Sequence, residues 1–120
     1  MRKDVFVDNA VSIKPQIINN EKIKDVKKRI LIGSNLEAPN FFMRLFVVGP
    51  GGHSPYHSHD WEHEVYVIKG KGAVITENGK KEISDNNFVF VPPNVKHQFK
   101  NLGKDELQFI CVIPSTADEE

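Results

Sequence analysis

Residues 51–64 read Gly-Gly-His-Ser-Pro-Tyr-His-Ser-His-Asp-Trp-Glu-His-Glu and contain four of the five histidines of the chain. Successive side chains alternate between the two faces of a β-strand, so His57 and His59 project from the same face. His63 lies four residues further on and keeps this parity if the chain stays extended or makes a short bend. A single histidine is more often a surface or core residue than a ligand, but three on one face favour a metal site.

The apolar runs around this segment are short and end at turn-forming residues. β-branched and aromatic residues dominate each run, and Gly, Pro or Asn usually follows it. Strand-like runs at a spacing of ~8–12 residues predict an all-β sandwich or barrel. The runs cover residues 41–48, 65–68, 73–76, 88–91 and 107–113. Between two of the runs, Asn78-Gly79 predicts a two-residue hairpin turn of type I′, in which both central residues have positive φ.

One segment, residues 20–30, fits two structures. Ile23, Val26 and Ile30 recur at intervals of three and four residues, as in an amphipathic helix. The chain then continues through Ile30-Leu31-Ile32, which suits a strand, and the later segments are predicted strands. We expect a strand from about Val26 to Ile32, with the helix as the alternative.

Composition excludes several classes of protein. The 120 residues include 16 Lys and Arg and 16 Asp and Glu, which argues against a nucleic-acid binder and a polybasic membrane-surface protein. Cys111 is the single cysteine, so an internal disulfide is excluded. No apolar run approaches the ~20 residues of a membrane span, and acidic residues near Met1 interrupt any signal-peptide core. We expect a cytoplasmic protein with one domain, residues 1–120, and a disordered acidic end at residues 118–120.

Two spaced motifs resemble those of the cupin superfamily. The first covers about residues 51–70 and consists of Gly51, five residues, His57-Ser58-His59, three residues, His63, six residues and Gly70. The second covers about residues 86–101 and consists of Asn86, five residues, Pro92-Pro93-Asn94, two residues, His97, three residues and Asn101. The resemblance covers most of the chain and implies the cupin double-stranded β-helix, a jelly-roll β-barrel.

The departures from the family pattern concern both turns and the metal site. Asn86 and Asn94 stand where the second motif has glycine, and asparagine is the residue that best tolerates a left-handed backbone in its place. His63 stands where the first motif has a metal-binding Glu, and Glu64 is the alternative ligand at a longer spacing. With His63, the resemblance implies a metal site formed by His57, His59, His63 and His97, as in small bacterial cupins that bind manganese or iron.

The alternation of side chains along each strand also predicts which residues face the interior of the barrel. Leu107, Phe109, Cys111 and Ile113 share one face of the last strand, and Phe99 shares a face with His97. We therefore expect Phe99, Phe109 and Cys111 at the pocket, with Cys111 as an inert buried thiol. His53 is expected at the pocket mouth and Trp61 as a packing residue in the bend between ligands.

These residues support three functional hypotheses. The first is an oxidoreductase of dioxygenase type that acts on a small apolar or aromatic substrate, because four imidazoles leave two positions open on a six-coordinate ion. The second is a non-redox isomerase or lyase that works through an enolate. The third is a non-catalytic module that binds a small molecule. Imidazole donors suit Fe, Zn, Ni, Co or Cu, while manganese enters through the resemblance. The family also implies a homodimer.

Overall fold

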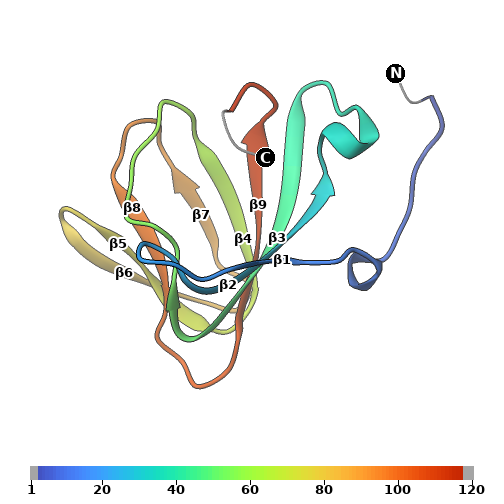
Figure 1. Ribbon diagram of the computed structural model, residues 1–120. Coiled ribbons are helices and arrows are strands. Elements are labelled where there is room, and N and C mark those ends of the chain that lie inside the picture. Colours follow the sequence, from blue (N-terminus) through green and yellow to red (C-terminus); the bar gives the residue numbers. More distant parts are fainter. Residues whose placement is uncertain (1–2, 118–120) are drawn as a thin grey trace.

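The computed structural model describes residues 3–117, and most of them form β-strands (Figure 1). The acidic end, residues 118–120, lies outside the described residues. Within them, no helix is long and apolar enough to cross a membrane. The strands are β1 (Gln16–Ile18), β2 (Lys24–Ile32), β3 (Phe41–His53), β4 (His63–Lys69), β5 (Lys71–Thr76), β6 (Gly79–Ser84), β7 (Phe88–Val91), β8 (His97–Asn101) and β9 (Leu107–Pro114). Two single turns of 3-10 helix, η1 (Ala10–Ser12) and η2 (Ser34–Leu36), flank β1 and β2.

All strand pairs are antiparallel, and they join into one curled sheet. The strand order is β6-β5-β8-β3-β9-β4-β7, with β2 also paired to β3 and β1 paired to β2. In Figure 1 the sheet folds over, so that β5, β6 and β8 face β3, β4 and β9 across the interior. A groove of about 890 Å³ lies between the two ends of the sheet and is lined by residues of β6 and β7. The prediction of an all-β barrel is confirmed.

The core follows the predicted alternation of side chains. Every second residue of β9 is buried, beginning with Leu107, and the same alternation holds in β4 and β8. The face that Leu107, Phe109 and Cys111 share is therefore the interior face, as parity predicted. An antiparallel sheet with one buried face gives this period of two because neighbouring side chains point to opposite faces.

Residues 24–32 form a strand rather than the alternative helix. Two irregularities explain why its apolar pattern resembled a helix. Asp25 has a φ of 51°, and the register with β3 shifts between Lys24 and Val26. A second shift lies between Ile30 and Ile32. At the first shift β2 advances by two residues while β3 advances by five, and at the second β2 advances by two while β3 advances by one. Both shifts are odd and reverse the parity of β2 relative to β3, so the period of two is lost in the sequence.

Two predicted turns differ from the structure. The β5–β6 hairpin is present, but Thr76 pairs with Gly79, so Glu77 and Asn78 form the turn. Of these residues only Gly79 has positive φ, at 113°, which excludes the type I′ turn and fits a glycine bulge after the turn. The strand expected to stop at residue 48 continues as β3 to His53.

Candidate metal centre

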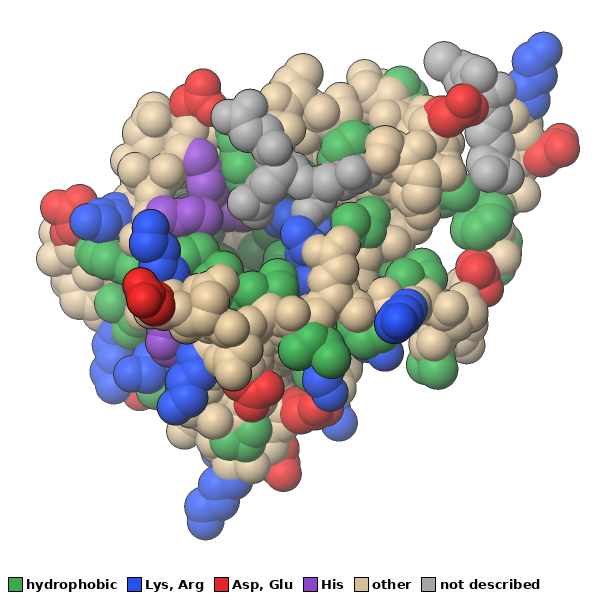
Figure 2. All heavy atoms as spheres, in the orientation of Figure 1, with side chains coloured by type: hydrophobic (Ala, Val, Ile, Leu, Met, Phe, Trp, Pro, Cys, Tyr) green, Lys and Arg blue, Asp and Glu red, His purple; other side chains and the backbone are tan. Residues whose placement is uncertain are grey.

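The four predicted ligand histidines converge at one place inside the barrel. His63 begins β4 and His97 begins β8, while His57 and His59 lie in the segment between β3 and β4. The backbones of His57 and His97 exchange two N–H···O hydrogen bonds of 3.1 and 2.9 Å, which hold the segment against β8. One ring nitrogen from each of the four residues lies within 4.8 Å of the others. Figure 2 shows histidine side chains beside a hollow that contains hydrophobic side chains.

Backbone carbonyls orient two of the imidazoles. Nδ1 of His59 lies 2.7 Å from the carbonyl oxygen of Trp61, and Nδ1 of His97 lies 2.8 Å from that of Val95. A carbonyl only accepts hydrogen bonds, so in both rings Nδ1 carries the proton and donates it. Nε2 is then unprotonated, which is the form that binds a metal ion.

His63 links the cluster to the interior of the sheet. Its Nε2 lies 2.9 Å from Nε2 of His59, and its Nδ1 lies 2.8 Å from Sγ of Cys111. Without a metal ion, the His63 proton can sit on Nε2 and be donated to His59. If an ion were bound by both rings, Nε2 of each would serve as a ligand, and Nδ1 of His63 would donate to Cys111. Either arrangement satisfies both contacts with a neutral ring.

The spacing of the nitrogens fits a metal ion. An ion bound at ~2.1 Å holds two neighbouring nitrogen ligands about 3.0 Å apart when they subtend a right angle. The 2.9 Å between the Nε2 atoms of His59 and His63 matches this separation. Glu64, the alternative ligand, is exposed on the opposite face of β4 and does not belong to the cluster. The candidate donor set is therefore four imidazoles.

His63 is neutral at ordinary pH because of its surroundings. Burial lowers its pKa from 6.5 to about 2, with further lowering from the positive charge of Arg44 and from the other three histidines. The neutral ring is the form that coordinates a cation. Sequence analysis did not single out Arg44, which is almost completely buried. On β3, Arg44 shares a face with Phe46 and Val48, because the three residues are spaced two apart. This spacing was the one indication in the sequence that Arg44 points into the barrel.

Arg44 is held beside the histidines by Cys111. It pairs with Cys111 across β3 and β9, and its Nη2 donates to Sγ over 3.2 Å. Its guanidinium also lies over the ring of Phe46, with Cζ 5.1 Å from the ring centroid. The sulfur thus contacts both a guanidinium and the Nδ1 of His63. Cys111 is buried as expected, but its contacts are polar, and it connects Arg44 to the cluster.

A cavity of about 120 Å³ adjoins the histidines and Arg44. Phe99, Phe109 and Cys111 line it, as sequence analysis predicted. Seven of the other twelve lining residues precede residue 51 and so lie outside both motifs. Its other lining residues are Ile18, Ile23, Val26, Lys28, Arg44, Phe46, Val48, Ser54, Pro55, His57, His63 and His97.

Two pocket candidates lie outside this wall. His53, expected at the mouth, pairs with Lys100 where β3 meets β8, and its Nδ1 lies 3.2 Å from Nε2 of Gln98. The register of β3 against β2 shifts between Val48 and His53, just before this junction. Trp61 stacks on His59 with ring centroids 3.6 Å apart and is partly buried against the core. It supports the ring of His59 instead of lining the cavity.

Comparisons with known proteins agree with this architecture. In sequence, the chain is 31% identical over 77 residues to the 1-methylthio-D-xylulose 5-phosphate methylsulfurylase of Rhodospirillum rubrum, covering 64% of this chain and 49% of that protein. The match therefore spans about half the length of that relative. The chain is also 24% identical over 105 residues to the polyketide synthase CurC of Streptomyces cyaneus, covering 82% of this chain and 68% of that one.

Among solved structures, the polyketide cyclase RemF from Streptomyces resistomycificus superimposes with a TM-score of 0.86 and 27% identity. That superposition covers 99% of this chain and 83% of the cyclase. The family model described as a cupin domain matches residues 44–113, which include both motifs and all four clustered histidines. The chain belongs to the cupin family.

Proposed function

We propose that this chain is a metal-dependent enzyme that converts a small, enolisable organic substrate by non-redox chemistry. One observation carries the proposal: Arg44, a buried cation, lines the same small cavity as His57, His63 and His97. A guanidinium on the wall of a cavity attracts negative charge, so it favours a substrate with an oxygen atom that becomes negative during the reaction over a neutral hydrocarbon.

The proposed ligands are His57, His59, His63 and His97. A divalent ion bound by them would act as a Lewis acid on a substrate oxygen. Because all four donors are neutral, they cancel none of the charge of the ion, unlike a site that contains a carboxylate. The set thus favours binding of an anionic or enolate oxygen over a neutral one.

The chain's own residues supply the rest of the site. Arg44 donates N–H groups toward negative charge in the cavity, and its contact with Cys111 holds the guanidinium in place before substrate arrives. The rings of Phe46, Phe99 and Phe109 exclude water, and electrostatic attraction is stronger where water is excluded. Because the cavity is small, it accepts the reacting end of a substrate.

The likeness to a polyketide cyclase supports ranking enolate chemistry first, because ring closure by carbonyl condensation proceeds through an enolate. Sequence analysis placed a dioxygenase-type oxidoreductase first, and that is the second candidate. The donor set favours it, because imidazoles bind redox-active iron, cobalt or copper as readily as zinc. Manganese is supported only by the family resemblance.

The two candidates differ in their need for a redox-active metal. We would load the metal-free protein separately with zinc, manganese and iron(II) and supply a phenyl-substituted 1,3-diketone. Proton–deuterium exchange at its central carbon is followed by NMR, and oxygen uptake is followed with an electrode. The enolate proposal expects exchange with zinc and manganese, no oxygen uptake, and loss of exchange in His97→Ala and Arg44→Met. Oxygen uptake with iron alone would establish the second candidate. Diketone binding that survives metal removal, with neither reaction, would indicate a binding module.

A further inference from the structure

The cavity beside the histidines is lined by a second cationic side chain, that of Lys28. The register of β2 with β3 pairs Lys28 with Phe46 and Ile30 with Arg44. Residues that lie directly opposite each other in an antiparallel pair point to the same face of the sheet, so Lys28 shares the interior face with Phe46 and Arg44. Lys28 is partly buried and lines the cavity, whereas its neighbour Lys27 is exposed.

The two cations are close enough to bind adjacent groups of one ligand. Arg44 is two residues from Phe46 on β3, so it is the diagonal neighbour of Lys28 across the strand pair. Side chains in this relation begin roughly 7–8 Å apart, and long ones reach each other. A small molecule in the cavity can therefore contact the ammonium group with one atom and the guanidinium with the next.

The charged side chains on the cavity wall are all positive. Among the described residues that line it, Lys28 and Arg44 carry a formal charge, and neither Asp nor Glu is present. Most of the other lining residues are apolar or are the neutral imidazoles of the candidate metal centre. Electrostatic attraction is stronger where apolar walls exclude water. The cavity therefore favours an anion over a neutral molecule.

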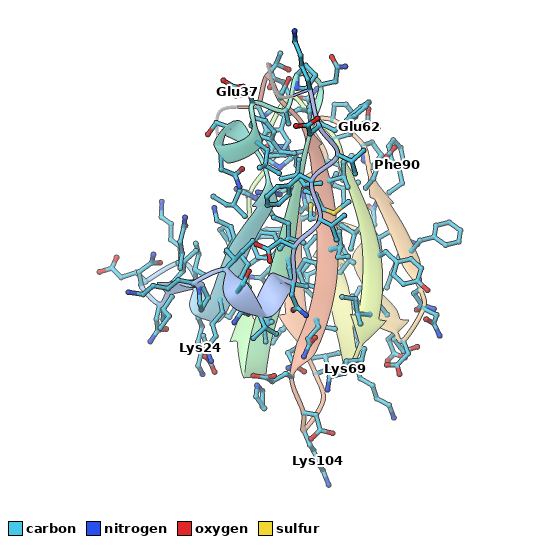
Figure 3. The ribbon with its side chains drawn as sticks, turned by 90° about the vertical axis from the view of Figure 1, so that its right-hand side faces the viewer. Lys24, Glu37, Glu62, Lys69, Phe90 and Lys104 are labelled. Carbon is cyan, nitrogen blue, oxygen red and sulfur yellow. The ribbon has the colours of Figure 1, made fainter. Side chains whose placement is uncertain are left out.

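This positive charge is local to the cavity and does not belong to a basic surface. The 16 Lys and Arg of the whole chain are balanced by 16 Asp and Glu. In Figure 3, Lys24 and Lys69 lie toward one end of the barrel and Glu62 toward the other. Glu62 directly precedes His63, so these two lysines lie away from the histidine end. Figure 2 shows Lys or Arg side chains at the hollow that the histidines border.

We propose that Lys28 binds a carboxylate of the substrate, and that the substrate is a small 2-oxo acid with an enolisable carbon beside its carbonyl group. This inference rests on the proposed function and names its substrate class. In a 2-oxo acid the carbonyl and the carboxylate occupy neighbouring carbons, as Arg44 and Lys28 occupy neighbouring positions on the wall. The carbonyl oxygen, which becomes negative in the enolate, faces Arg44, and the carboxylate accepts a charge-assisted hydrogen bond from Lys28.

The test compares phenylpyruvate with phenylacetone, in which a methyl group replaces the carboxylate. Calorimetry of the zinc-loaded full chain at pH 7 gives a dissociation constant for each compound. A hydrogen bond between charged groups changes such a constant by roughly tenfold or more, so phenylpyruvate should bind at least tenfold more tightly than phenylacetone. In Lys28→Met the ratio of the two constants should fall close to one.

Two further variants separate the charge of Lys28 from its neighbourhood. Lys27→Met is the matched control, because it removes the same charge from the adjacent exposed position of β2, and it should keep the wild-type ratio. Lys28→Arg retains a cation at the cavity and should keep most of the ratio. Circular dichroism verifies that each variant is folded.

Equal affinity of the wild type for the two compounds, or a Lys28→Met variant that keeps the wild-type ratio, would overturn the proposal. A ratio that survives in Lys28→Met and disappears when zinc is removed would place the carboxylate on the metal ion, which also overturns it. Failure of the proposed function is distinguishable, because these constants are measured without turnover. If phenylpyruvate binding depends on Lys28 but its methylene carbon exchanges no protons with any metal, the carboxylate site stands and the enolate chemistry is wrong.

Discussion

Replacing Cys111 by valine tests the connection between Arg44 and the histidine cluster. The sulfur lies 3.2 Å from Nη2 of Arg44 and 2.8 Å from Nδ1 of His63, and all three residues are buried. Valine has no hydrogen-bonding atom but nearly the same shape as cysteine. Serine retains an acceptor at the same branch of the side chain. The pair Cys111→Val and Cys111→Ser therefore separates the polar contact from packing.

The loss in the free energy of unfolding depends on the contacts that each variant removes. Leaving a buried polar group without its hydrogen-bond partner costs about 1–3 kcal/mol, and more for a charged group. Loss of both contacts in Cys111→Val should then destabilise the metal-free protein by about 3–5 kcal/mol. Cys111→Ser retains both contacts at slightly longer distances, and we expect a loss of about 1 kcal/mol. A difference of at least ~2 kcal/mol between the variants corresponds to a factor of about 30 in the unfolding equilibrium.

Urea unfolding of the metal-free proteins at pH 7 measures the loss of stability. Calorimetric titration with zinc measures the change in metal affinity. Because the sulfur orients His63, Cys111→Val should also weaken zinc binding by about 10–100-fold, the usual effect of removing a group that orients a ligand. Cys111→Ser should remain within a few-fold of the wild type. If valine and serine variants have the same stability and the same zinc affinity, the sulfur contacts contribute nothing and the reasoning is wrong.

Three further predictions use other parts of the structure. The pKa of His63 is about 2 in the folded chain and about 6.5 when unfolded, so only the unfolded state binds this proton between those values. Urea unfolding of the metal-free protein should show stability falling by up to ~1.4 kcal/mol per pH unit below pH 6.5, with a shallower slope in His63→Gln. Asn101 donates to Val48 and Asp105 and accepts from Gly103, so Asn101→Leu should cost about 2–4 kcal/mol, against little for Lys100→Leu, in thermal unfolding. Asn94 has a φ of 68° and its N–H donates to the His59 carbonyl over 2.6 Å. Calorimetry should find weaker zinc binding in Asn94→Val and unchanged binding in Asn94→Gly.

Sequence patterns predicted the parts of the fold that keep strict alternation. His63, Val65 and Val67 alternate with exposed residues, and so do the inward residues of β9. Asn86 and Asn94 both have a φ of 68°, so the expectation that asparagine replaces glycine in these turns is confirmed. Where the backbone departs from regular geometry, alternation fails. The bulge at Asp25 and the turn that uses Glu77 and Asn78 depend on registers that only the paired strands determine.

The candidate site, like the fold, depends partly on short sequence motifs and partly on contacts between segments that are distant in the sequence. The histidines lie in two short motifs, and the resemblance of these motifs to the cupin pattern placed all four together. The cavity wall combines Ile18, Ile23 and Val26 with residues of β3, β8 and β9, and only the curled sheet brings these segments into contact.

Arg44 lies between these cases, because its inward parity is visible in the sequence while its partner is not. A charge at an inward position of an apolar strand is costly unless neighbouring groups stabilise it, and the contact of Arg44 with Sγ of Cys111 exists only because β3 pairs with β9. In the proposed function, the same guanidinium attracts negative charge on a substrate in the cavity, so one buried residue connects the strand register to the chemistry of the site.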